Sequence, residues 1–124
     1  GAVALSIAHD SHNIIVVGVS DEEMEFAVNS LIAQEGGMVL VKEGKVIESM
    51  PMPIAGLMSD QSGEWVDEKL TAIHAKAYEE LGIAGDVEPV MTLCFMSLAV
   101  IPEVKLTDMG LFDVTTFSFI PVEA

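Results

Sequence analysis

Residues 14–32 read IIVVGVSDEEMEFAVNSLI, a strand followed directly by a helix. Ile14–Val19 is almost wholly apolar, which is typical of a strand covered on both faces. Ser20 and Glu23 form a capping box, in which the serine hydroxyl accepts from the Glu23 amide and the glutamate reaches back. Apolar residues then recur at helical spacing up to Ile32, so one helix face is buried. We therefore expect an amphipathic helix packed on a sheet, with Ile14–Val19 in the middle of that sheet.

The segments on either side of this unit predict two hairpins and a second helix. Val3–Ala8 and Ile14–Val19 flank five polar residues, as two strands flank a turn. Gly44 supplies the positive φ for a second hairpin, which pairs residues 38–42 with 45–50 and ends at Pro51 and Pro53. Ser62 is placed to cap an amphipathic helix from Glu64 to Leu81.

The last third of the chain reads as two further strands. Val90–Ile101 is the longest apolar run and is rich in β-forming residues, which predicts an interior strand that Pro102 ends. Residues 107–110 have the composition of a turn, and Thr115–Val122 predicts a final strand. The expected order is ββαββαββ: a single α+β domain with a mixed or antiparallel sheet and two amphipathic helices packed on it.

Composition and charge exclude several classes of function. The 124 residues include 5 Lys and Arg against 20 Asp and Glu, for a net charge of −15 at pH 7. Nucleic acids and anionic membranes are bound through positive charge, so we expect neither as a partner. The single cysteine, Cys94, suits a reducing, cytoplasmic setting. Because the chain begins with Gly1 rather than Met, we expect it to be a piece of a longer protein.

One cluster concentrates the groups that carry chemistry: His9, Asp10, Ser11, His12 and Asn13. An imidazole beside a carboxylate can be tuned as an acid or base, and two histidines with Asp10 could share a metal. Asp, Ser and Asn are also ordinary turn residues. Two imidazoles exceed what a turn needs, so we favour a site or interface. We expect both rings near the surface, with Asp10 orienting one of them and at least one ring hydrogen-bonded to a carboxylate or carbonyl.

Other candidates have simpler explanations. Cys94 is expected to be a buried thiol, and His74 a satisfied histidine at the edge of a helix face. Asp60 and Asp108 suit helix caps or turns. The loop after Pro51 is rich in Met and Pro, which is also typical of a docking surface.

Three stretches together resemble the C-terminal domain of bacterial adenine deaminase, a member of the amidohydrolase superfamily. They are IAHDSHNIIVVG (residues 7–18), PIAGLMSD (residues 53–60) and IPEVKLTD with its continuation (residues 101–114). The resemblance covers essentially the whole chain, residues 1–124. It adds candidate loop contacts to the cluster above, at Gly56, Met58, Ser59, Asp60 and Asp108.

The resemblance implies a part in purine metabolism. Enzymes of this family are hydrolases that convert adenine to hypoxanthine and ammonia, using a pair of manganese or iron ions in a barrel. That barrel is absent here, so we expect no catalytic or metal-binding residue in this chain and no activity from it alone. Expected partners are the barrel of the same parent chain, adenine, and further copies of the parent in a homo-oligomer. Either residues 9–13 complete or shield the active site, or the domain is a non-catalytic assembly module.

Overall fold

The main sheet has four antiparallel strands in the order β2-β1-β3-β4. In the computed structural model, which describes residues 1–123, these strands are β1 (Ala2–Leu5), β2 (Ile15–Gly18), β3 (Gly37–Lys42) and β4 (Lys45–Pro51). Both predicted hairpins are confirmed. Glu43 and Gly44 turn the second one with φ of 52° and 69°, which are the two positive values that a tight hairpin turn requires.

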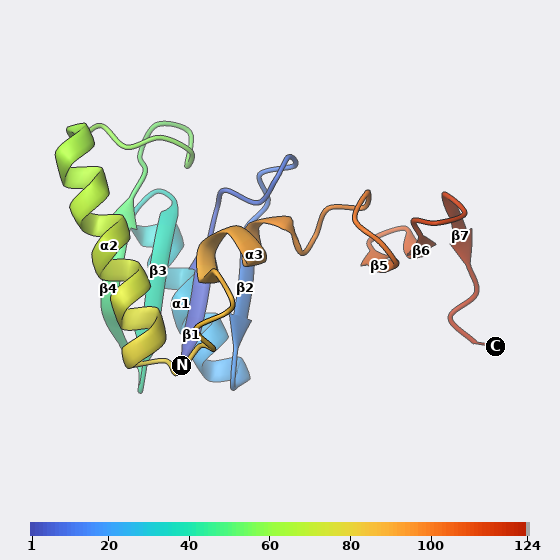
Figure 1. The fold of residues 1–124 in the computed structure, drawn as a ribbon, viewed down its shortest axis with the longest axis horizontal. Helices are drawn as coiled ribbons and strands as arrows, with labels where there is room; N and C mark the ends of the chain where they lie inside the picture. The colour runs from blue at the N-terminus through green and yellow to red at the C-terminus, as the bar shows by residue number, and fades with distance from the viewer. Residues whose placement is uncertain (124) are drawn as a thin grey trace.

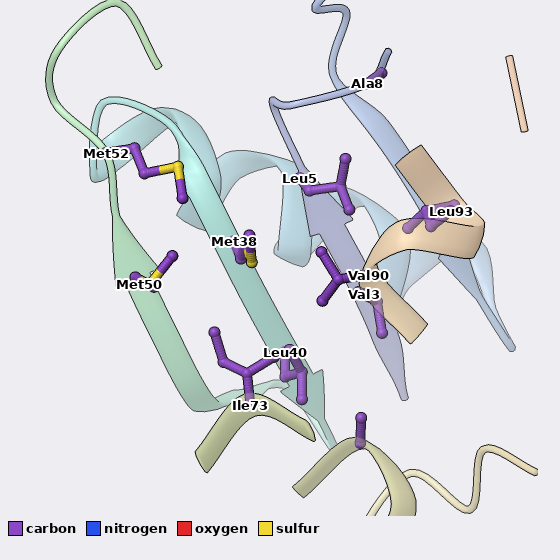
Figure 2. Close-up of a cluster of buried hydrophobic side chains, with 11 residues drawn as sticks. Val3, Leu5, Ala8, Met38, Leu40, Met50, Met52, Ile73, Val90 and Leu93 are labelled. Carbon is purple, nitrogen blue, oxygen red and sulfur yellow. The ribbon is translucent and has the colours of Figure 1, made fainter. Parts of the chain in front are cut away.

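Helices cover both faces of this sheet (Figure 1). Helix α1 (Asp21–Ala33) is capped by Ser20 as predicted, since its hydroxyl accepts from the Glu23 amide. The reciprocal half of the predicted capping box was wrong, because the Glu23 carboxylate accepts from the Glu43 amide and pairs with the amino group of Gly1 instead. Helix α2 (Gly63–Glu79) is capped by Ser62 in the same way. Helix α1 packs on one face through Ala27 and Leu31. Helix α2 and a third helix, α3 (Pro89–Phe95), pack on the other, where they join residues of β1, β3 and β4 in the buried cluster of Figure 2.

Two strand predictions were wrong. Ile14–Val19 lies at the edge of the sheet rather than in its middle, and Val17 and Val19 are 52% and 82% exposed. The central place belongs to β1, which is buried along its whole length. The predicted strand at Val90–Ile101 is helix α3 followed by turns. Glu88 caps that helix by accepting from the Met91 amide, Pro89 suits its first turn, and Val90, Leu93 and Cys94 form its buried side.

The C-terminal residues form a second, three-stranded antiparallel sheet in the order β5-β6-β7. Its strands are β5 (Val104–Thr107), β6 (Gly110–Asp113) and β7 (Ser118–Ile120), with the predicted turn between β5 and β6. Figure 1 shows that this sheet stands away from the rest of the molecule, beyond an extended segment after α3. The α+β class is confirmed, but the element order is ββαββααβββ rather than ββαββαββ.

An ion-pair network of one carboxylate and two lysines joins α2 to β4. Glu48 accepts from Lys69 Nζ at 2.8 Å and pairs with Lys76 Nζ at 3.2 Å, and its side chain is only 13% exposed. Burial raises the pKa of Glu48, but the hydrogen bonds from Lys69, the Ser49 amide and Lys76 outweigh it and leave the pKa below its usual value of 4.5.

Substituting Glu48→Gln should therefore lower the free energy of unfolding at neutral pH by about 1–2 kcal/mol. A carboxylate with a lowered folded pKa stabilises the protein above its unfolded pKa and loses that effect as pH falls through the folded value. The gap between wild type and the variant should accordingly close below about pH 4.5. Urea melts across this range measure it, with Glu68→Gln as control, because Glu68 is an exposed acid on α2, the helix that carries Lys69 and Lys76. A gap that stayed constant down to pH 3 would contradict this role.

Candidate functional site

The polar cluster at residues 9–13 forms the tip of the β1–β2 hairpin. The His12 amide donates to the Ala8 carbonyl at 2.8 Å, and the His9 amide donates to the Cys94 carbonyl at 2.8 Å. The Cys94 thiol in turn donates to the Ile7 carbonyl at 2.8 Å. The end of α3 thus holds the base of the tip in place, and the predicted burial of Cys94 is confirmed.

All five tip side chains are exposed, so the expected surface position of the two imidazoles is confirmed. The expectation of a local hydrogen bond to either ring was wrong: among residues 1–123, neither the His9 nor the His12 ring bonds to a carboxylate or carbonyl, and Asp10 orients neither. The His9 ring instead packs against the Phe95 ring, with centroids 5.0 Å apart. An aromatic contact needs no polar partner, which leaves the ring nitrogens available.

Asp10, Ser11 and Asn13 line one side of a cleft of about 670 Å³. The other side is the segment that leads from α3 to β5, together with the β5–β6 turn, where Asp108 lies. Thr107 shapes that turn, since its hydroxyl donates to the Gly110 carbonyl at 2.8 Å and accepts from the Met109 amide at 3.2 Å. The fold therefore brings the first and third family-like stretches to one cleft, although about a hundred residues separate them.

The second stretch, residues 53–60, follows the C-terminal end of β4. It lies at the same end of the main sheet as the hairpin tip, but outside this cleft. Strands β1 and β4 are both antiparallel to β3, so they run in the same direction. The segments that follow β1 and β4 therefore leave the sheet at the same end (Figure 1). Gly56 is tied to the base of the tip, because the Ser6 hydroxyl donates to its carbonyl at 2.5 Å. Ser59 and Asp60 accept from the backbone and side chain of Gln61, and Met58 is 58% exposed.

Ser6 is a residue that sequence reasoning missed. It is the buried polar residue of the structure, and its hydroxyl also accepts from the Gly37 amide at 2.7 Å. Gly36 and Gly56 approach closely beside it, since a Cβ on Gly36 would lie 2.6 Å from the Gly56 Cα. The hydroxyl thus fixes the position of the second stretch relative to the tip. A serine in an apolar run was a signal that something polar must satisfy it.

The cleft residues Ser97–Val100 were also missed, because an interior strand was expected up to Ile101. Leu106 and Thr107 belong to the third stretch but were not singled out as site residues. The Glu88-Pro89 pair is a helix-start signal that would have shortened that run. The expectation for His74 is confirmed: Nδ1 lies 2.7 Å from the Leu70 carbonyl, and Nε2 pairs with Glu88. His74 therefore joins α2 to the cap of α3 and stays away from the cleft.

The donor set does not fit the metal pair that the resemblance implies. Within residues 1–123, no three His, Cys, Asp or Glu side chains gather closely enough to hold a metal ion. None of the helices in this part of the chain is long and apolar enough to cross a bilayer.

Comparison with known proteins points to one family. Its model, described as the adenine deaminase C-terminal domain, matches residues 1–118. The chain is 75% identical over 124 residues to adenine deaminase 2 of Desulfotalea psychrophila and spans 22% of that protein. It is 54% identical to adenine deaminase of Halalkalibacterium halodurans and 47% identical to that of Bacillus subtilis, spanning 20% and 21% of their lengths.

Proposed function

The chain belongs to the adenine deaminase C-terminal domain family, and from this we propose that it is the C-terminal part of a longer adenine deaminase. It spans about a fifth of the relatives it matches. The longer enzyme hydrolyses adenine to hypoxanthine and ammonia, in the cytoplasm. Since the donor set here does not fit a metal pair, the metal site and the bond-breaking chemistry belong to the remaining four-fifths, a metal-binding barrel.

Within that enzyme, this domain completes and shields the adenine site through the cleft between the hairpin tip and the β5–β6 turn. The cleft is the observation that carries this proposal, because it gathers Asp10, Ser11, Asn13 and Asp108 from two distant stretches. Adenine presents N–H donors and ring-nitrogen acceptors at its edge. Carboxylates accept from the former, and hydroxyl and amide groups donate to the latter. A cap over the site also excludes water, which strengthens those interactions.

The test is steady-state kinetics of the longer enzyme carrying Asp10→Asn or Asp108→Asn. Loss of charge at either position should lower kcat/KM for adenine by about tenfold, mainly through KM, because these groups bind adenine without acting on the reacting carbon. Asp67→Asn is the matched control, since Asp67 is an exposed acid of helix α2 that lies outside the cleft. Light scattering reports the oligomeric mass in each case.

The variants His9→Ala and His12→Ala, at the same tip, test whether the imidazoles also contribute to kcat/KM for adenine. Unchanged kcat/KM in all four variants would overturn the shielding role. A changed oligomeric mass with normal kcat/KM per active site would support the second candidate function, a non-catalytic assembly module for a homo-oligomer. The exposed apolar side chains of Ile54 and Met58, in the loop after Pro51, favour that candidate, because such a loop can dock on another subunit.

A further inference from the structure

The β5-β6-β7 sheet carries an apolar face with nothing packed on it. Its registers align Leu106 with Leu111, and Leu111 with Ile120, so these three side chains share one face across the three strands. Val104, two residues before Leu106, lies on the same face. Leu106 is 82% exposed and Val104 44% exposed.

A sheet of three short strands is stable only when a second layer covers its hydrophobic face. Within residues 1–123, no helix packs extensively against this one, and Figure 1 shows it standing apart from α1, α2 and α3. The opposite face carries the Phe112 ring between those of Phe117 and Phe119, at 5.2 and 5.3 Å, and Phe117 and Phe119 are themselves 71% and 56% exposed. Both faces therefore remain partly uncovered, and the face of Leu106 is the one that adjoins the cleft of the hairpin tip.

Leu106 also lines the cleft of the hairpin tip, with Thr107 and Asp108. Whatever enters that cleft meets the polar tip on one side and the apolar sheet face on the other. A second copy of this chain suits it poorly, because the net charge of −15 repels a like-charged molecule and Asp10 and Asp108 would face further acids.

We propose that this apolar face docks against an apolar surface on the catalytic part of the same polypeptide. This inference rests on the proposed function, in which the cleft faces that part. The four-fifths of the related proteins that lie outside this chain supply ample surface for it. The C-terminal sheet is then a strap that holds the tip over the adenine site.

Hydrogen exchange of the longer enzyme tests the docking, with Leu106→Glu as the probe and Val19→Glu as its matched control. Both positions are 82% exposed in this chain, but Val19 lies beyond the end of β2, away from the cleft. A buried charge on the docked face should speed exchange of the β5–β7 amides by about tenfold or more, because the strap is then released. Val19→Glu should leave those amides unchanged.

Equal exchange of the β5–β7 amides in wild type and Leu106→Glu would overturn the docking, as would an equal acceleration by Val19→Glu. Protection that rises with enzyme concentration would also overturn it, because a second copy would then be the covering surface. These readouts are independent of catalysis. If the Asp10 and Asp108 variants keep full kcat/KM while Leu106→Glu releases the strap, the shielding role fails and the docking stands.

Discussion

The 124-residue chain, purified alone and supplied with manganese and adenine, should release no ammonia. Adenine deaminases are metal-dependent in general, and among residues 1–123 no three His, Cys, Asp or Glu side chains lie close enough to hold a metal ion. The expected loss relative to the longer enzyme is complete. A coupled assay for ammonia measures it, and circular dichroism with a thermal melt shows whether the sample is folded.

Metal-dependent ammonia release by the folded chain would show that it contains a catalytic centre. That result would contradict the assignment of the chemistry to the rest of the enzyme. The longer enzyme, assayed in the same buffer, is the positive control.

Substituting Gly37→Ala should nearly abolish folding, at a cost of about 4 kcal/mol or more, against a total stability of about 5–15 kcal/mol for a typical domain. Gly37 has a φ of +107°, which L side chains rarely adopt. A Cβ there would lie 2.0 Å from the Met50 carbonyl oxygen and 2.9 Å from the Met52 amide nitrogen. Both are backbone atoms of β4 and its exit, which cannot move without breaking the β3–β4 pairing.

Gly44→Ala is the matched control, since Gly44 also has a positive φ, of +69°, but nothing lies within 4 Å of its Cβ position. The free energy of unfolding of this variant should fall by only about 1–2 kcal/mol, which is the cost of holding an L residue at positive φ. Urea unfolding of both variants separates the steric effect from the conformational one. Equal losses of stability in the two variants would contradict this prediction, because the backbone around Gly37 would then have moved to accommodate the added Cβ.

The local elements were predictable because their signals are local. The Ser20 and Ser62 caps, the Glu43-Gly44 turn and the turn at residues 107–110 depend on hydrogen bonds and φ values within four residues. Such patterns are present in the sequence whatever the chain does elsewhere. The three family-like stretches were recognisable on the same terms, and they assigned the chain to its family.

The position of each strand in the sheet was not predictable in this way. Ile14–Val19 is as apolar as a central strand, but β1 takes the central place because its small residues Ala2 and Ala4 let α1 pack closely. Val90–Ile101 has the composition of a strand, but the Glu88 cap and the contacts of Val90 and Leu93 with the sheet make its first half a helix. Burial by neighbours distant in sequence overrides local preference.

Residue type and spacing determined the hairpin tip and its exposed histidines, since five consecutive polar residues are costly to bury without hydrogen-bond partners. The cleft is a property of the tertiary structure alone. Asp10 and Asp108 line the same cleft because α3 bonds to the base of the tip through His9 and Cys94, and the chain after α3 passes beside the tip. The bare face of Leu106 has the same origin: strand alternation places the leucine on one side of the sheet, and only the path of the chain after α3 leaves that side without a covering layer.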